Sequence, residues 1–185
     1  MNKVLTFIPI LVLLSCGATQ TTIIENGKEA KGHLKNGLKN GTWTFYKAGK
    51  VDAVGTFVKD QKNGDWSYFY DNGKLHQKGE FRNGKQNGIW QYYFDNGSFM
   101  GMGELVDGKQ NGVWKWYHKN GNLYTERWYV DGKLMEIKSC FDSRKNVLDC
   151  GTISNGNGTM LFHDIENESD TIQEFQYKNG VIKNE

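Results

Sequence analysis

The side chains that could act in catalysis are few and scattered along the chain. The histidines are His33, His76, His118 and His163. None of them belongs to a nucleophile or metal-binding motif, and the sequence lacks the serine-hydrolase, zinc-protease and phosphate-loop patterns. Folding could bring together two carboxylates for glycoside hydrolysis, but no acidic residue lies inside the aromatic segments, where a sugar would stack. We therefore expect a protein that is not an enzyme and that uses no cofactor and no metal.

The first fifteen residues have the shape of an export signal. Lys3 precedes an apolar run from Val4 to Leu14, and these eleven residues are too few to span a bilayer, which takes about 20. The segment Leu13-Leu14-Ser15-Cys16 resembles the lipobox of bacterial lipoproteins. That resemblance implies cleavage after residues 1–15, acyl chains such as palmitate on Cys16, and a membrane-anchored protein of the bacterial cell envelope. The alternative is an ordinary signal peptide cleaved nearby, which would leave Cys16 as a spare thiol.

Two further cysteines, Cys140 and Cys150, remain if Cys16 carries the lipid. In an exported protein such an even remainder favours a disulfide between them. Metal binding is disfavoured because no second cysteine pair or histidine pair lies nearby at the spacing of zinc ligands. We therefore predict a disulfide that closes a short loop.

The composition indicates that strands are the elements that position these residues. The 185 residues include 23 glycines, one proline (Pro9) and 14% aromatic residues, which is more aromatic than a disordered chain. Alanine is scarce whereas tyrosine, phenylalanine and tryptophan are abundant, and this favours strands over helices. The net charge of +2 argues against nucleic acid as the main partner, because phosphate neutralisation needs a concentrated basic surface.

A repeat of 23 or 24 residues organises the middle of the chain. Each copy holds a tryptophan and a glycine in constant phase, with an Asn-Gly pair just before the tryptophan and an aromatic cluster after it. The tryptophans are Trp43, Trp66, Trp90 and Trp114, and the glycines are Gly55, Gly79 and Gly103. We predict that these glycines leave room for a neighbouring tryptophan to lie flat over the backbone.

These repeats resemble the bacterial MORN-type repeat, in the variant found in proteins labelled YwqK-family antitoxins. The resemblance covers residues 26–138 and rests on four consecutive copies that hold Gly, Asn-Gly and Trp in register. It implies a meander of β-hairpins that makes an extended, curved antiparallel sheet. For function it implies interaction with a membrane or a protein, and the family label adds an antitoxin role.

The turn residues lead to the same fold. Thirteen of the 23 glycines follow Asn and two follow Asp. Such pairs between short apolar runs are strong hairpin signals because both residues tolerate positive φ. We predict that these glycines lie in hairpin turns, one before each tryptophan and one after each aromatic cluster. The predicted fold is all-β, an elongated single-layer antiparallel meander of repeated β-hairpins.

Side chains of the strand after each turn alternate between two faces of this sheet. One face receives an apolar ladder made of Trp43, Phe45, Trp66, Tyr68, Tyr70, Trp90, Tyr92, Phe94, Trp114 and Trp116. The opposite face receives a row of aromatic residues among polar ones, namely Tyr46, Phe69, Tyr93 and Tyr117. This row either stabilises a thin sheet through cross-strand pairs or forms a platform for a glycan, a peptide or a lipid headgroup. We treat it as the candidate binding face.

The two ends of the chain depart from the repeat. Residues 16–25 are predicted to form a tether, and residues 139–185 degenerate repeats that make an acidic cap, with an insertion closed by the disulfide between Cys140 and Cys150. Residues 28–138 carry 18 Lys and Arg against 12 Asp and Glu, and residues 139–185 carry 4 against 8. Either the lysines of the repeats protect the sheet edges, or the basic body attracts anionic envelope lipids or an acidic partner.

Together these features predict a non-catalytic envelope lipoprotein that works as a repeat binding or scaffold module for a protein, lipid or glycan partner. The alternative is an antitoxin or immunity protein, and the export signal then requires that its toxin act in the cell envelope. Membrane contact is expected through the lipid on Cys16. Neither nucleic acid nor metal is an expected partner.

Overall fold

The computed structural model describes residues 20–25, 27–163 and 172–183. The predicted signal over residues 1–15 and the predicted lipidation site at Cys16 lie outside these ranges. Within them all regular elements are β-strands, and no helix is long and apolar enough to span a membrane. The strands are β1 (Thr21–Glu25), β2 (Lys28–Lys35), β3 (Leu38–Lys47), β4 (Lys50–Val58), β5 (Gln61–Phe69), β6 (Leu75–Arg82), β7 (Lys85–Tyr93), β8 (Phe99–Val106), β9 (Lys109–Tyr117), β10 (Leu123–Val130), β11 (Lys133–Cys140), β12 (Gly158–His163), β13 (Ile172–Lys178) and β14 (Val181–Ile182).

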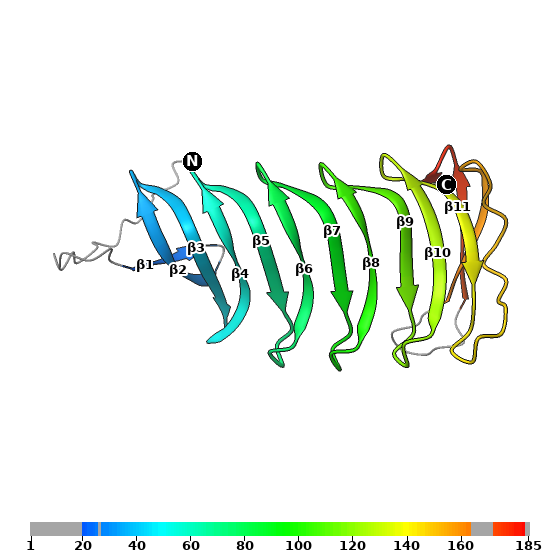
Figure 1. The fold of residues 1–185 in the computed structure, drawn as a ribbon, viewed down its shortest axis with the longest axis horizontal. Coiled ribbons are helices and arrows are strands. Elements are labelled where there is room, and N and C mark those ends of the chain that lie inside the picture. The colour runs from blue at the N-terminus through cyan, green and yellow to red at the C-terminus, as the bar shows by residue number, and fades with distance from the viewer. Residues whose placement is uncertain (1–19, 26, 164–171, 184–185) are drawn as a thin grey trace, which may run out of the picture.

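Strands β1 to β11 form one antiparallel sheet in which each strand pairs only with its neighbours along the chain. Figure 1 shows these strands side by side in a long row, with β1 at one end and the carboxy-terminal segment at the other. The predicted all-β meander of hairpins is therefore confirmed. The sheet begins earlier than predicted, because residues 21–25 of the predicted tether form β1, where Ile23 pairs with Ala30 of β2.

Two kinds of connection join the strands, one at each end of the hairpins. At one end, two-residue turns lead into the tryptophan-bearing strands; they are Asn36-Gly37, Lys59-Asp60, Asn83-Gly84 and Asp107-Gly108, all at positive φ. At the other end, five-residue loops follow the aromatic clusters at residues 70–74, 94–98 and 118–122. In the first of these loops the N–H of Gly73 donates to the carbonyl of Tyr70 at 2.8 Å. Each repeat therefore contributes two strands, as the turn residues predict.

The prediction that the Asn-Gly pair just before each tryptophan forms a hairpin turn is wrong. Gly41, Gly64, Gly88 and Gly112 lie inside β3, β5, β7 and β9, at φ of 69°, 68°, 69° and 68°. The strand pairing shifts in register beside each of them, as it does between Gly55 and Thr56 of β4. A register shift around a glycine at positive φ is a β-bulge. Turns and bulges both use positive φ, so the dipeptide alone does not distinguish them.

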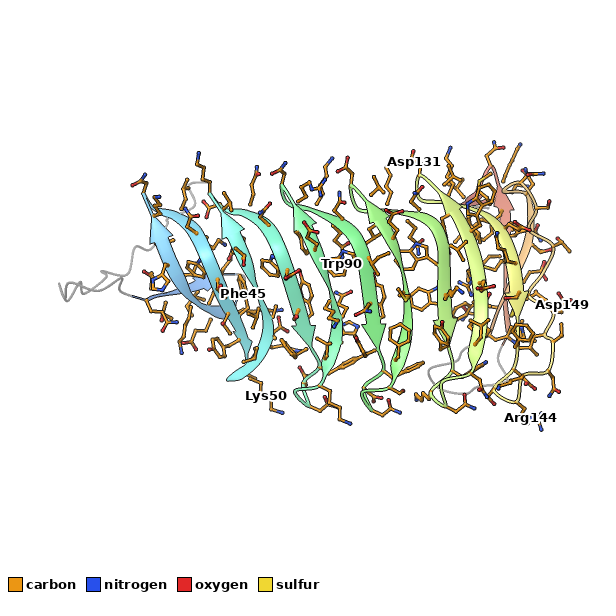
Figure 2. All side chains as sticks on the ribbon, in the orientation of Figure 1. Phe45, Lys50, Trp90, Asp131, Arg144 and Asp149 are labelled. Carbon is orange, nitrogen blue, oxygen red and sulfur yellow. A yellow bond between two sulfur atoms is a disulfide. The ribbon has the colours of Figure 1, made fainter. Side chains whose placement is uncertain are left out.

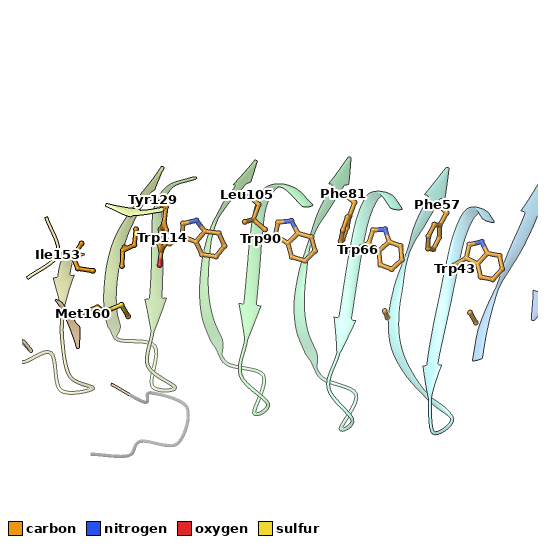
Figure 3. Close-up of a cluster of buried hydrophobic side chains, with 13 residues drawn as sticks. Trp43, Phe57, Trp66, Phe81, Trp90, Leu105, Trp114, Tyr129, Ile153 and Met160 are labelled. Atoms are coloured by element: carbon orange, nitrogen blue, oxygen red, sulfur yellow. The ribbon is translucent and has the colours of Figure 1, made fainter. Parts of the chain in front are cut away.

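The core is a row of tryptophans on one side of the sheet, which we call the tryptophan face (Figure 3). Trp43, Trp66, Trp90 and Trp114 are all buried. Each indole lies over a glycine of the preceding strand, where a Cβ would overlap the ring; these glycines are Gly32, Gly55, Gly79 and Gly103. Each indole N–H also donates to the carbonyl ten residues earlier, as Trp90 does to Glu80 at 3.2 Å. Figure 2 shows Trp90 in the middle of the strands, with Lys50 and Asp131 at the turns.

Tyr70, predicted to lie on the tryptophan face, is part of the loop at residues 70–74. Because β5 ends at Phe69, the alternation of the strand does not extend to Tyr70. Its hydroxyl donates to the carbonyl of Tyr93 at 2.7 Å, and its ring lies 4.5 Å from the ring of His76. Phe94 occupies the equivalent position in the next loop, where it is buried. These loop residues connect one repeat to the next.

The array ends where its two marker positions change residue type. Arg127 stands 24 residues after Gly103, and Lys138 stands 24 residues after Trp114. Arg127 is 8% exposed, and its guanidinium lies 5.8 Å from the centre of the Tyr124 ring. In the earlier repeats the equivalent position is a glycine, which leaves space for the indole of the next strand. The tryptophan row therefore stops at Trp114.

The carboxy-terminal strands β12 to β14 form a separate sheet, so the predicted degenerate repeats of residues 139–185 do not continue the meander. The chain around this sheet covers β11. Leu134 N–H donates to Gly180 O, and Gly156 N–H donates to Met135 O, both at 2.9 Å. The buried side chains of Ile153 and Met160 extend the core beyond the last tryptophan (Figure 3). This segment caps one end of the large sheet.

Residues 142–146 lie in phase with the repeat, which corrects the predicted insertion. The loop starts 24 residues after the loop at residues 118–122. In both loops the first N–H donates to the carbonyl four residues later, at 2.9 Å here and 2.8 Å in the earlier loop. A disulfide joins Cys140 and Cys150, whose Cα atoms are 6.1 Å apart, on either side of this loop. The segment is a further copy of the repeat's loop, closed by a covalent link.

Candidate functional site

The predicted binding residues lie on the side of the sheet opposite the tryptophans, which we call the opposite face. Tyr46, Phe69, Tyr93 and Tyr117 are all partly exposed. Each pairs with an apolar residue of the following strand, and these partners are Val51, Leu75, Phe99 and Leu123. Phe99 lies 5.7 Å from the ring of Tyr93 and 5.4 Å from the ring of Tyr117, so contacts continue between repeats. We call these eight residues the aromatic stripe.

Strand alternation does not predict the four partners, because each of them comes just before a register shift. Between β5 and β6 the pairing shifts by one residue, so that Leu75 rather than His76 lies opposite Phe69. The same shift places Phe99 opposite Tyr93. A sequence signal for these residues exists, since an apolar residue stands two positions after the glycine of each loop.

A polar row runs beside the aromatic stripe on the opposite face. Ser67, Lys78, Gln91 and Lys115 occupy this row on β5, β6, β7 and β9. Lys115 Nζ lies 2.8 Å from the carboxylate of Glu126, and the hydrogen bond and charge of that carboxylate raise the pKa of Lys115. The surface is therefore apolar along the stripe and polar beside it, as protein interfaces commonly are.

A pocket of about 570 Å³ lies on the tryptophan face near the amino-terminal end of the sheet, and we call it the basic pocket. Three of its lining side chains form an aromatic floor: Phe45, Trp66 and Tyr68. The ring centres of Phe45 and Trp66 are 5.9 Å apart, and those of Trp66 and Tyr68 are 5.8 Å apart. Four lysines and three carboxylates also line it, namely Lys28, Lys39, Lys62, Lys85, Glu25, Asp52 and Asp60. The basic pocket therefore combines charged groups with aromatic side chains.

Two lysines of the basic pocket are paired with carboxylates. Lys28 Nζ lies 2.6 Å from Asp52, and Lys39 Nζ lies 2.6 Å from Glu25. Only 12% of the Lys39 side chain is exposed, whereas 42% of the Glu25 side chain is, so only the lysine of this second pair is shielded from water. These pairs balance the charge of both lysines inside the pocket.

Lys62 has a different environment. Its Nζ donates to the Tyr68 hydroxyl at 2.8 Å and lies 4.2 Å from the centre of the Trp66 ring. Among the described residues no carboxylate lies within ion-pair distance of it. Burial, and then the charge of Lys39, lowers the pKa of Lys62, whereas burial raises the pKa of Tyr68 to about 12. Lys62 is therefore a half-buried cation of the pocket that makes no direct ion pair with a described carboxylate.

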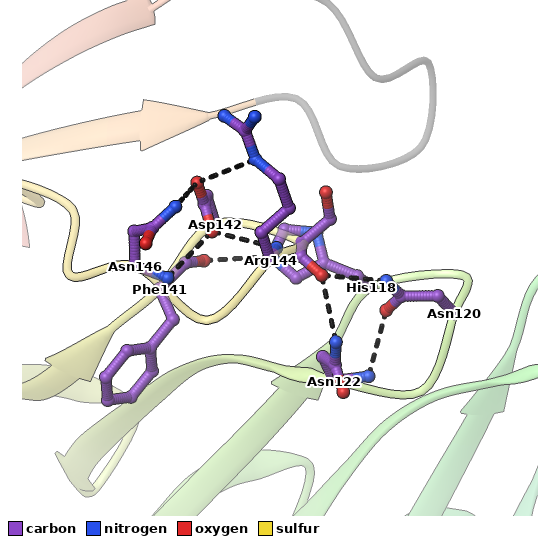
Figure 4. Close-up of polar contacts among 8 residues, drawn as sticks. His118, Asn120, Asn122, Phe141, Asp142, Arg144 and Asn146 are labelled. Atoms are coloured by element: carbon purple, nitrogen blue, oxygen red, sulfur yellow. Dashed lines mark hydrogen bonds and ion pairs between the residues drawn. The ribbon is translucent and has the colours of Figure 1, made fainter.

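His118 links two loops. Its Nε2 donates to the carbonyl of Phe141 at 2.8 Å (Figure 4). The side chains of Asn120 and Asn122 both donate to the carbonyl of Ser143, at 2.8 and 2.9 Å. Within the described ranges no group of three or more His, Cys, Asp or Glu side chains is placed to hold a metal ion. The polar network of Figure 4 ties neighbouring loops together.

Comparison with known families identifies two of the repeats. Residues 62–83 and 110–131 match the MORN repeat variant. Each match spans a tryptophan-bearing strand and the strand after it, β5 with β6 and β9 with β10, and the matches start 48 residues apart, which is two periods of 24. No curated protein matches the chain. The chain thus carries MORN-type repeats, which suggest a repeat binding module.

Proposed function

We propose that this protein is a non-catalytic binding module of the bacterial cell envelope, anchored by a lipid on Cys16, which holds a partner protein on the aromatic stripe. The observation that carries the proposal is the stripe itself. Its eight apolar residues run along the opposite face from β3 to β10, whereas the buried core lies on the tryptophan face. The sheet therefore presents aromatic side chains that its core does not enclose.

The dimensions and chemistry of the stripe favour a protein as its partner. Eight strands at about 4.8 Å spacing extend over roughly 34 Å, which is the scale of a protein interface and exceeds a single sugar or headgroup. Aromatic residues are enriched in the centre of such interfaces, and polar groups form their borders. Lys78, Gln91 and Lys115 supply a border of this kind.

The envelope location rests on the amino-terminal sequence. The short apolar run and the lipobox resemblance at residues 13–16 support export followed by acylation of Cys16. Replacement of Cys16 by Ser tests the anchor directly. We expect the Cys16→Ser protein to leave the membrane fraction, and its retention there would contradict the lipid assignment.

Site-directed crosslinking tests the stripe. A photoreactive side chain at Leu75 of the membrane-anchored protein should capture one stoichiometric protein partner in its own cells. Tyr93→Ser should reduce this adduct about tenfold or more, because it removes an aromatic side chain from the centre of the stripe. Gln86→Ala, a change in the same strand at a position that pairs with Phe81 on the tryptophan face, is the matched control and should leave the adduct unchanged.

The outcomes of this experiment separate the alternatives. An adduct that Tyr93→Ser leaves unchanged would show that the stripe is not the contact surface. Capture of a growth-inhibiting protein would identify the module as an immunity protein of the envelope. Saturable turnover of an envelope polysaccharide by the purified protein would overturn the non-catalytic assignment.

A further inference from the structure

The basic pocket is a feature of the first repeats alone. Lys39 and Lys62 occupy a repeat position that holds Gln86 and Gln110 in the next two copies. Lys62 pairs across the strands with Phe57, as Gln86 pairs with Phe81. Because glutamine fills this position without loss of the repeat, the fold does not require a lysine there. The charge of Lys62 therefore calls for an explanation other than sheet stability.

Lys62 is placed to donate to an anion inside the pocket. Lys28 and Lys39 each form an ion pair with a carboxylate at 2.6 Å, whereas the Nζ of Lys62 donates a hydrogen bond to the Tyr68 hydroxyl. An ammonium group carries three N–H donors, so two remain beyond the bond to Tyr68. Lys62 is half-buried, which disfavours its charged form, and an anionic ligand in contact with its Nζ would offset that cost.

The floor and rim of the pocket narrow the class of ligand. Phe45 and Tyr68 are partly exposed on either side of the buried Trp66, and their rings offer apolar surface on which the face of a sugar ring can pack. Gln61 and Asn83 at the rim supply amide groups that can donate to or accept from hydroxyls. The volume of about 570 Å³ lies within the range of about 300–1,000 Å³ that is usual for small-molecule sites.

The charge balance distinguishes a carboxylate from a phosphate. Glu25, Asp52 and Asp60 line the same pocket and repel any anion that enters it. The four lysines of the lining outnumber these three carboxylates by one, so a monoanionic carboxylate neutralises the lining, whereas a dianionic phosphate leaves an excess negative charge. The site therefore suits a ligand with one negative charge beside an apolar ring face and several hydroxyls.

We propose that the basic pocket binds an acidic sugar unit of the uronic acid class, with its ring against Phe45 and Tyr68 and its carboxylate on Lys62. This site lies on the tryptophan face and is independent of the aromatic stripe. Glycan binding at the pocket and protein binding at the stripe are thus separate proposals about the two faces, and an experiment can contradict either one without contradicting the other.

Calorimetric titration of the purified full-length protein tests the proposal. Galacturonic acid, which carries one carboxylate, is the acidic probe, galactose is its neutral counterpart, and inorganic phosphate is the competing anion. We expect galacturonic acid to bind with a submillimolar Kd and galactose to bind about tenfold more weakly, since it lacks the carboxylate. Lys62→Gln should weaken galacturonic acid binding about tenfold without lowering Tm, because glutamine occupies this position in other repeats.

Lys115→Gln, on the opposite face, is the matched control and should keep the affinity of the unmodified protein. If galacturonic acid shows no binding at concentrations up to about 10 mM, the proposal is overturned. An unchanged Kd in Lys62→Gln would do the same. Equal affinity for phosphate or for galactose would overturn the assignment to an acidic sugar.

Discussion

The two faces of the sheet use aromatic side chains for different purposes. Trp90 and Tyr93 are three residues apart in β7, and the first is 0% exposed while the second is partly exposed. Trp90 lies flat on Gly79 and donates to a backbone carbonyl, whereas Tyr93 meets Phe99 at the surface. Aromatic content alone therefore does not identify a binding surface. The contact with backbone glycine marks the structural rings, and partial exposure marks those available to a partner.

Alanine substitution in β7 should give the largest difference between the faces. Trp90→Ala removes a fully buried indole and leaves a cavity against Gly79, so we expect a loss of about 4 kcal/mol in the free energy of unfolding. Tyr93→Ala should cost about 1 kcal/mol, because that ring is partly exposed. Urea unfolding of both variants measures the difference. Equal losses would contradict the assignment of the core to the tryptophan face.

A side chain added at the glycine position should have the next largest effect. Gly79→Val places a Cβ where the ring of Trp90 lies, and the resulting displacement should cost about 3 kcal/mol. Ser67→Val adds a side chain of the same shape to the opposite face, where we expect a change of about 0.5 kcal/mol or less. Thermal unfolding of the two variants compares them, and an unchanged Tm for Gly79→Val would show that the flat packing is dispensable.

Alkaline pH should weaken the tryptophan face through its partly buried tyrosines. Burial raises the pKa of Tyr68 from 10.0 to about 12, and burial raises the pKa of Tyr92 as well. The folded state therefore holds these protons more tightly than the unfolded state, and the stability this provides is present below about pH 10 and lost as pH rises toward about 12. We expect Tm to fall over this range.

Tyr68→Phe separates this titration from other alkaline effects. The variant should lose less Tm between pH 10 and pH 12 than the unmodified protein. Tyrosinate absorbance should also lose its most alkaline component in the variant. An identical pH profile for the two proteins would show that Tyr68 ionises in the folded state as readily as in the unfolded state.

The architecture is predictable from the sequence because the turn residues and the core residues recur at the same positions of each repeat. Four tryptophans in phase with glycines predict a meander, and the structure has one. The bulges at Gly64 and Gly88 do not follow, since Asn-Gly serves a turn and a bulge equally well. The separate cap is not predictable either. Arg127 replaces the repeat's glycine and is buried, and the sequence alone does not show that this arginine is buried.

The candidate sites are predictable to different degrees. Simple alternation along each tryptophan-bearing strand predicts Tyr46, Phe69, Tyr93 and Tyr117. Leu75 and Phe99 join the stripe only through register shifts on the following strands. The basic pocket depends on residues as far apart as Glu25 and Lys85. Its unbalanced lysine appears only when ion pairs can be assigned in space, so no reading of the sequence separates Lys62 from its neighbours.

The strictly sequential pairing of β1 to β11 determines how the chain can fold. Each hairpin closes with residues close by in sequence, and local contacts of this kind form quickly because little loop entropy is lost. Folding can therefore start at any hairpin and spread to its neighbours, as in other linear arrays. The bonds that Gly156 and Gly180 make to β11 involve residues that are synthesised after β11, so the growing sheet keeps an open edge until they emerge.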